Sequence, residues 1–187
     1  MAGDADRPFL RADRYIVDRA GAALARVDPP TVARILELFA RSPKIFVYGA
    51  GRSGIIGRAL AMRLVQAGLS AYVIGESVTP IVQKGDLVVI FSNRGESYSS
   101  IQTANIVRRE GAELIVVTSR PSSKIAHAAT VLISLEIPED ADRPVYAPLG
   151  TVFEAASLRL SDALIAEWMR ARGETEESMR RRHAIMV

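Results

Sequence analysis

Five short apolar runs recur along the middle of the chain and predict five buried strands. They cover residues 45–48, 71–74, 87–91, 114–118 and 131–135. Each run is apolar at nearly every position, as expected for strands that are buried on both faces of a sheet. Apolar residues at helical spacing lie between the strands, for example Ile55, Ala59 and Met62. This alternation, with its short connections, predicts a parallel sheet with right-handed crossovers.

Two helices are predicted before the sheet and two after it, which makes a three-layer α/β/α sandwich. They cover residues 6–27, a segment that starts after Pro29-Pro30, residues 151–172 and residues 174–182, and a short helical turn is expected at 124–129. Residues 138–150, PEDADRPVYAPLG, are predicted to form an irregular loop with a function, because loops of this length are uncommon in compact domains. No repeat or linker divides residues 1–187. One domain is therefore expected, with helices in 1–42, the sheet core in 43–137 and helices and a tail in 151–187.

Composition supports this interpretation and removes several classes of site. The chain has 187 residues, of which 49% are hydrophobic, enough for one sizeable core. It has no cysteine, which excludes disulfides, thiolate metal sites and a cysteine nucleophile. No apolar run approaches the roughly 18 residues that span a bilayer. The early acidic residues and the lack of an apolar segment argue against a signal peptide, so a cytoplasmic protein without a membrane partner is expected.

The formal net charge of +3 is small, and much of the positive charge lies near the C-terminus. The arginines there are Arg170, Arg172, Arg180, Arg181 and Arg182. A solvated helix end is the favoured interpretation, and binding of a small anionic substrate is the second. RNA is the third, because no aromatic residues alternate with the arginines. No nucleic-acid partner is predicted.

The stretch VYGAGRSG at 47–54 raises the question of what binds at the first turn. Gly49, Gly51 and Gly54 fit the dinucleotide pattern G-x-G-x-x-G, which follows a strand and opens a helix. Glu76 stands 22 residues after Gly54, near the place of an acidic residue that binds a ribose. The polar Ser53 before the third glycine and the short chain weaken a dinucleotide interpretation without excluding it.

A second polar turn, SNRGES at 92–97, follows the third predicted strand. Ligands of open parallel sheets bind beyond the carboxyl ends of the strands, near the point where the strand order reverses. Ser92, Ser97 and the free N–H groups of the next helix are therefore expected to surround one phosphate. Helix capping is the structural alternative for Ser53 and Ser97.

Several motifs in order resemble the sugar isomerase (SIS) domain and, within it, the 6-phospho-3-hexuloisomerases. They are VYGAGRSG at 47–54, AMRL at 61–64, VIGE at 73–76 with Thr79-Pro80, KGDLVVIFS at 84–92, VVTSRPSS at 116–123, APLGTVFE at 147–154 and MRRRHA at 179–184. The resemblance implies a flavodoxin-like five-stranded sheet and interconversion of D-arabino-3-hexulose 6-phosphate and fructose 6-phosphate, in the ribulose monophosphate route of formaldehyde handling. It implies no metal or organic cofactor. It also implies a homodimer or homotetramer with its site near a subunit boundary.

The second turn departs from the pattern S-G-S-G-E-T that is usual in this family. Asn93 replaces a glycine, and Arg94 replaces the middle serine. Arg94 is expected either to hold phosphate through a charge-assisted fork or to point outward and weaken the site. A smaller departure is Val78, where a threonine is more usual.

The resemblance implies two catalytic residues, Glu154 and His183. Isomerisation needs a base that takes a proton from carbon, and the family's glutamate falls on Glu154. The alternative is a capping box, because Thr151 and Glu154 have the spacing T-x-x-E. His183 is expected to move a proton between oxygens or to open a sugar ring, in a tail that can reach a neighbouring subunit. His127 is expected on a helix surface or in packing.

The predicted phosphate-binding set completes the site. It comprises Gly51, Arg52, Ser53, Ser92, Arg94 and Ser97, where Arg52 contacts either the substrate or an acidic group at an interface. The leading hypothesis is a sugar-phosphate isomerase of the hexuloisomerase type. Another SIS isomerase, such as one that acts on a pentose 5-phosphate, and a non-catalytic phosphosugar sensor are the alternatives.

Overall fold

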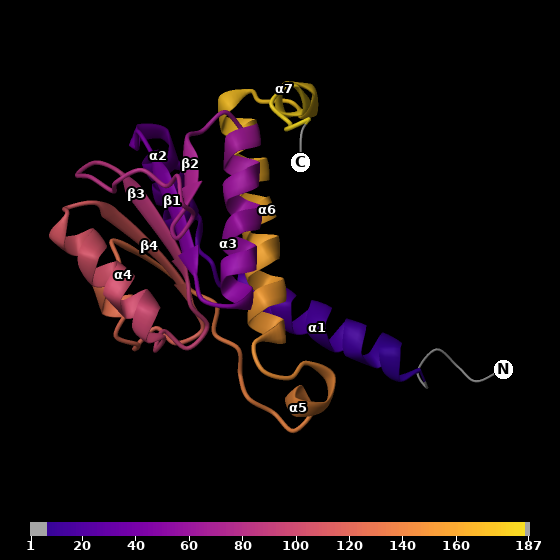
Figure 1. Ribbon diagram of the computed structural model, residues 1–187. Coiled ribbons are helices and arrows are strands. Elements are labelled where there is room, and N and C mark those ends of the chain that lie inside the picture. Colours follow the sequence, from indigo (N-terminus) through magenta and orange to yellow (C-terminus); the bar gives the residue numbers. More distant parts are fainter. Residues whose placement is uncertain (1–6, 186–187) are drawn as a thin grey trace.

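The protein, a computed structural model that describes residues 7–185, contains one five-stranded parallel sheet (Figure 1). The strands are β1 (Ile45–Gly49), β2 (Ala71–Val73), β3 (Leu87–Phe91), β4 (Glu113–Thr118) and β5 (Val131–Ser134). Their order in the sheet is β2-β1-β3-β4-β5, and every pair is parallel. This is the strand order of a flavodoxin-like sheet, in which successive strands are added on one side of β1 and then, from β3, on the other. The predicted fold class is confirmed.

Six helices of six residues or more surround the sheet within residues 7–185. They are α1 (Pro8–Leu24), α2 (Pro29–Arg41), α3 (Arg52–Gln66), α4 (Tyr98–Arg109), α6 (Thr151–Arg172) and α7 (Glu176–Arg181). A 3₁₀ turn, η2 (Ala126–Ala128), stands where the helical turn at 124–129 was predicted. α1 ends three residues earlier than predicted, and the predicted start at Asp6 lies outside the described residues. α7 is likewise shorter than the predicted 174–182, because Thr175 caps it.

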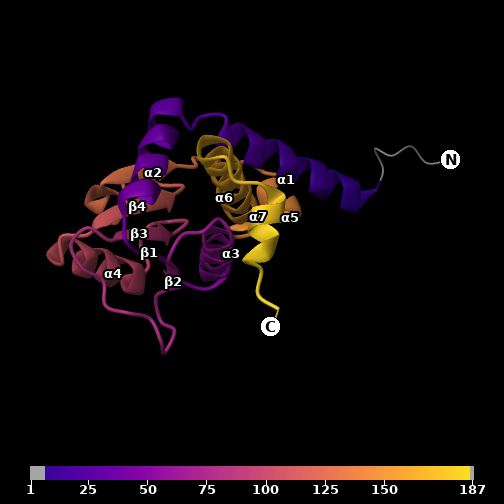
Figure 2. The ribbon, with the colours of Figure 1, turned by 90° about the horizontal axis from the view of Figure 1, so that it is seen from above.

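Helices cover both faces of the sheet, and two separate hydrophobic cores result (Figure 2). Ile45 and Val47 of β1 pack into the core beneath α2, α3 and α6. Phe46, between them, packs into the smaller core beneath α4 and η2. Successive side chains of a strand point to opposite faces, so a strand between two cores must be apolar at both sets of positions. The continuous apolar runs of the sequence have this cause.

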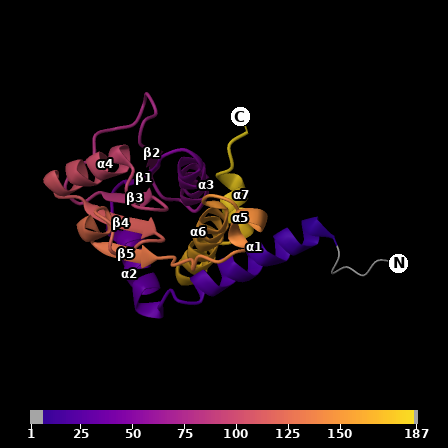
Figure 3. The same ribbon diagram turned by 90° about the horizontal axis from the view of Figure 1, so that it is seen from below.

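The segment 138–150 was predicted to be an irregular loop. The structure differs, because the segment contains the short helix α5 (Arg143–Tyr146). Asp140 starts it: one carboxylate oxygen accepts the backbone N–H groups of Asp142 and Arg143 at 3.0 and 2.9 Å. The same carboxylate accepts the Tyr15 hydroxyl at 2.9 Å and forms an ion pair with Arg19. Tyr15 and Arg19 belong to α1, which lies beside both α5 and α6 (Figure 3). The segment is therefore held against α1.

Among residues 7–185 no helix is long and apolar enough to cross a membrane.

Candidate functional site

Three glycines at the junction of β1 and α3 allow the end of the strand and the start of the helix to approach closely. A Cβ on Gly54 would lie 2.5 Å from the carbonyl oxygen of Gly49, and a Cβ on Gly49 would lie 2.6 Å from the backbone of Ser53. Gly51 differs, because nothing lies within 4 Å of its Cβ position, but its φ of 60° and ψ of −132° suit glycine alone. This turn delivers the first N–H groups of α3 to the carboxyl edge of the sheet, where they favour an anion.

Ser53 and Ser97 lie at the starts of α3 and α4, and neither hydroxyl makes a capping hydrogen bond there. The N-cap residue of α3 is Gly51 rather than Ser53. Ser97 is the N-cap residue of α4, but its hydroxyl makes no capping bond and instead lies 3.0 Å from the Ser99 hydroxyl. Ser53 is nearly buried, with 9% of its surface exposed. The capping alternative is therefore wrong for Ser97 and unsupported for Ser53.

A cavity of about 400 Å³, here called the switch-point cavity, lies where the strand order reverses. Its lining residues are Ala50, Ser53, Phe91, Ser92, Asn93, Arg94, Glu96, Ser97, Gly150 and Glu154. The structure thus brings together Ser53, Ser92, Arg94, Ser97 and Glu154 of the predicted set. Hydroxyls, a guanidinium and helix N–H groups in one hollow suit a phosphate, and a carboxylate beside them can exchange protons with the rest of a sugar.

Glu154 does not form the capping box that its spacing allowed. The Thr151 hydroxyl donates to the carbonyl oxygen of Pro148 at 2.7 Å, and Gly150 is the N-cap residue of α6. The Glu154 side chain is instead 14% exposed and accepts a hydrogen bond from Arg52 Nε on Oε2 at 2.5 Å. The capping alternative is wrong here as well, and the Glu154 carboxylate lies free of the backbone at the cavity wall.

Arg52 contacts Glu154 within the chain, which is a third outcome beside the substrate or interface acid that the sequence left open. Its side chain is 70% exposed and lies on the outer face of α3 and α6. Ile55 and Leu158 flank it there, exposed to 65% and 43%. Arg52 and Gly51 therefore stand next to the switch-point cavity without lining it.

His183 lies at the opposite end of the molecule from Glu154. The preceding Arg182 donates to the carbonyl oxygen of Gln66, the last residue of α3, at 3.0 Å. Glu154 is in the first turn of α6, whereas the tail follows α7 beyond the last turn, and Figure 1 shows α5 and α7 at the two ends of α6. A helix of 22 residues is about 33 Å long. One chain therefore does not place His183 beside Glu154.

The remaining charged candidates have structural partners. Glu76, the acidic residue of the dinucleotide interpretation, forms an ion pair of 2.7 Å with Arg58 of α3. Four of the C-terminal arginines pair with nearby glutamates: Arg170 with Glu167, Arg180 with Glu176, Arg181 with Glu177 and Arg182 with Glu174. His127 is exposed on η2. The favoured interpretation of the C-terminal run as a solvated helix end agrees with this pairing. No group of three histidine or acidic side chains within residues 7–185 is arranged to hold a metal.

The lining residues that were not predicted as part of the site are Ala50, Phe91, Asn93, Glu96 and Gly150. The Asn93 side chain meets the Ser119 hydroxyl at 2.7 Å, so it connects the turns after β3 and β4. A Cβ on Gly150 would lie 3.1 Å from Glu154 Oε1 and 3.2 Å from Asn93 Nδ2. The sequence signal for Asn93 was its replacement of a glycine in SNRGES, and the signal for Gly150 was its position in the motif APLGTVFE.

Comparison with known proteins places this geometry in a family. The SIS domain family matches residues 38–158. The 3-hexulose-6-phosphate isomerase of Methylomonas aminofaciens is 36% identical over 81% of this chain and 84% of its own. The enzyme of the same name from Bacillus subtilis is 37% identical over 76% and 80%. A crystal structure from Methanococcus jannaschii, described as inferring the function of a 3-hexulose-6-phosphate isomerase, has a TM-score of 0.83 and 28% identity and covers 91% of this chain and 98% of its own. The resemblance found in the motifs is confirmed, and the chain belongs to the SIS domain family.

Proposed function

We propose that the chain is a 3-hexulose-6-phosphate isomerase, which interconverts D-arabino-3-hexulose 6-phosphate and fructose 6-phosphate. The observation that carries the proposal is the switch-point cavity, where serines from two turns face the carboxylate of Glu154. The isomerase relatives, at 36% and 37% identity, support the choice of reaction. This activity belongs to the ribulose monophosphate route of formaldehyde handling.

The phosphate is held at the turns, and the chemistry takes place toward α6. Ser53, Ser92 and Ser97 supply hydroxyls, and the starts of α3 and α4 supply N–H groups. Arg94 lines the same cavity and adds a charge-assisted fork, the binding alternative of the sequence prediction. Positioning by a distant phosphate leaves the sugar carbons beside Glu154 and lowers the entropic part of the barrier.

Glu154 is the proposed base. Its carboxylate removes the proton from C2 of the 3-hexulose, which forms a 2,3-enediolate, and returns a proton to C3, while the proton on O2 moves to O3, which gives the 2-ketose. The negative charge on the enediolate oxygen needs a nearby donor, since such stabilisation is a large part of catalysis. Arg52, bound to Glu154 in this structure, holds the carboxylate in its orientation at the cavity wall.

His183 completes the site from a second copy of the chain. An exposed apolar stripe runs along α3 through Ile55, Met62 and Val65, which are 65%, 54% and 44% exposed. Stripes of this kind on a helix face mark subunit contacts. A partner related by a two-fold axis perpendicular to α3 on this face has its α3 antiparallel to this one, which brings the partner's tail toward the Arg52–Glu154 pair. A homodimer or homotetramer with its site at the boundary is therefore proposed.

The test is turnover in a coupled assay that detects fructose 6-phosphate formed from the 3-hexulose phosphate. Glu154→Gln should lower kcat by at least about 100-fold, the usual scale for loss of a general base, with unchanged thermal unfolding. The matched control for His183→Asn is His127→Asn, which changes the other histidine and should retain full activity. No turnover by the intact wild-type oligomer would sink the proposal. Conversion of a pentose 5-phosphate instead would favour another SIS isomerase, and binding without conversion would favour a sensor.

Subunit mixing tests the shared site. Inactive Glu154→Gln and inactive His183→Asn chains, unfolded and refolded together, should regain about a quarter of the wild-type sites, because each mixed dimer keeps one intact site. Mixing each variant with itself should regain nothing. If the two inactive variants stay inactive together while forming mixed dimers, Glu154 and His183 act within the same chain or not at all.

A further inference from the structure

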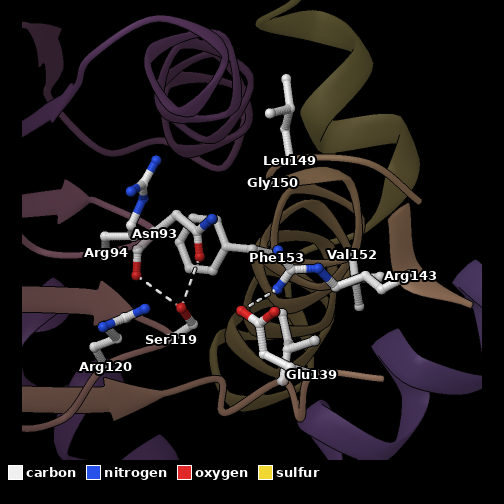
Figure 4. A pocket seen from close by; sticks show the side chains of 11 residues that line it. Asn93, Arg94, Ser119, Arg120, Glu139, Arg143, Leu149, Gly150, Val152 and Phe153 are labelled. Carbon is white, nitrogen blue, oxygen red and sulfur yellow. Dashed lines mark hydrogen bonds and ion pairs between the residues drawn. The ribbon is translucent and has the colours of Figure 1, made fainter. Parts of the chain in front are cut away.

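A second cavity, here called the arginine cavity, shares part of its lining with the switch-point cavity. Figure 4 shows the side chains that line the arginine cavity. Its volume is about 420 Å³, and it shares Asn93, Arg94 and Gly150 with the switch-point cavity. The turn after β4, the segment 138–150 and the start of α6 form its other walls. The proposed reaction of a sugar monophosphate uses none of the residues that line the arginine cavity alone.

Three arginines line the arginine cavity against a single carboxylate. They are Arg94, Arg120 and Arg143, and the carboxylate is that of Glu139. Arg143 pairs with Glu139 at 2.7 Å, as Figure 4 shows. Within residues 7–185 neither the Arg94 nor the Arg120 guanidinium has a carboxylate partner at ion-pair distance. The cavity therefore carries an excess positive charge, and guanidinium forks match the oxygens of phosphate or carboxylate.

The walls of the arginine cavity are fastened to the rest of the fold. The hydroxyls of Thr118 and Ser119 both donate to the carbonyl oxygen of Asn93, at 2.9 and 2.8 Å, and the backbone N–H of Arg120 donates back to Thr118. On the opposite wall, Asp140 accepts the backbone N–H of Arg143 and is itself held by α1. The arginines thus start from fixed backbone positions, which lowers the entropy lost when they bind.

We propose that the arginine cavity binds the second anionic group of a sugar bisphosphate whose first phosphate lies in the switch-point cavity. From the proposed function this inference takes only the binding of the first phosphate in the switch-point cavity. Asn93, Arg94 and Gly150 line both cavities, and Gly150 lies next to Glu154, where the end of the sugar opposite the first phosphate would lie. Ile137, Val152 and Phe153 give the second cavity an apolar side that suits a carbon chain. A bisphosphate therefore binds more tightly than the monophosphate substrate and competes with it.

The test compares two ligands that cannot react because they lack a carbonyl: glucitol 6-phosphate and glucitol 1,6-bisphosphate. Titration calorimetry on the full chain should give a dissociation constant about ten-fold lower for the bisphosphate, equivalent to about 1.4 kcal/mol. Arg120→Gln should remove that ten-fold difference, leave the affinity for glucitol 6-phosphate unchanged and leave turnover at the wild-type rate. Arg170→Gln makes the same charge change near the far end of α6 and should keep the difference.

The inference fails if the bisphosphate binds no more tightly than the monophosphate, or if Arg120→Gln leaves the difference intact. It also fails if free inorganic phosphate raises the affinity for glucitol 6-phosphate as much as the tethered phosphate does, since the cavity would then hold a separate anion. Turnover of the 3-hexulose phosphate is measured on the same samples. Turnover without a bisphosphate advantage leaves the proposed function in place, whereas a bisphosphate advantage without turnover leaves only the binding inference.

Discussion

Replacement of Gly150 by alanine should reduce activity without reducing stability. The new Cβ would lie 3.1 Å from Glu154 Oε1 and 3.2 Å from Asn93 Nδ2, whereas ordinary contacts begin at 3.4 Å. The backbone of Gly150, with φ −96° and ψ 10°, accepts alanine. The carboxylate must therefore retreat, and Arg52 resists this because it holds the other oxygen at 2.5 Å.

The structure sets the magnitude of this effect. Moving Oε1 from 3.1 to 3.4 Å displaces the proposed base by about a third of an ångström, and a misplacement of about 1 Å can reduce a rate by about 100-fold. A third of that on a logarithmic scale is a loss of about five-fold in kcat/KM. Alanine stiffens the unfolded chain by about 0.4–1 kcal/mol but is a poorer N-cap residue by a similar amount, so the free energy of unfolding should change by less than about 1 kcal/mol.

The assay is kcat/KM in the coupled reaction together with thermal unfolding of the same sample. Gly21→Ala is the matched control, because its Cβ meets only an arginine side chain at 3.7 Å, within α1. It should raise stability by up to about 1 kcal/mol with no change in kcat/KM. If Gly150→Ala kept full kcat/KM in a correctly assembled protein, the position of Glu154 would not depend on Gly150, and the reasoning would be refuted.

Three further predictions concern the turns. Gly54→Ala places a Cβ 2.5 Å from the carbonyl oxygen that ends β1 and should reduce the free energy of unfolding by about 1–3 kcal/mol or more in urea titration; an unchanged midpoint would contradict the observed approach. Gly95→Ala combines a φ of 66° with a Cβ 2.1 Å from the Ser123 hydroxyl and should abolish glucitol 6-phosphate binding, which retained affinity would disprove. Burial raises the pKa of Asp140, but hydrogen bonds, chiefly from Tyr15, lower it by more, so its folded pKa lies below the ordinary value for aspartate. Its stabilisation is present above the unfolded pKa and is lost as pH falls through the folded one; Tm should therefore fall less from about pH 5 to about pH 3 in Asp140→Asn than in wild type, and equal falls would refute the assignment.

The strands and the long helix were predictable because their signals are local. A strand between two cores is apolar at every position, so the predicted strands start and end within one residue of the observed ones. The C-terminal end of the helix 151–172 was predictable because Gly173 adopts the left-handed conformation that stops it. The helix α5 was missed because it depends on Asp140, whose position is set by Tyr15, 125 residues away.

The site was predictable to the extent that topology decides it. Serines that follow β1 and β3 must meet at one edge of the sheet, and they do. The T-x-x-E spacing misled, because a local pattern cannot reveal that Arg52, 102 residues away, takes up the Glu154 side chain. Asn93 and Gly150 were not assigned to the site for the same reason, since they lie close together only across turns that are distant in sequence.

The turn between β1 and α3 also shows what a shared G-x-G-x-x-G pattern means when two protein sequences are compared. Gly49 and Gly54 are needed because two backbones meet there, whereas Gly51 is needed for its dihedral angles, which a residue of the opposite chirality such as D-alanine would prefer. All three demands come from the path of the chain and would hold with no ligand bound. Unrelated lineages that bring a helix this close to its strand should therefore arrive at G-x-G-x-x-G independently. A match to this pattern thus indicates the same backbone conformation and does not by itself indicate the same ligand or reaction.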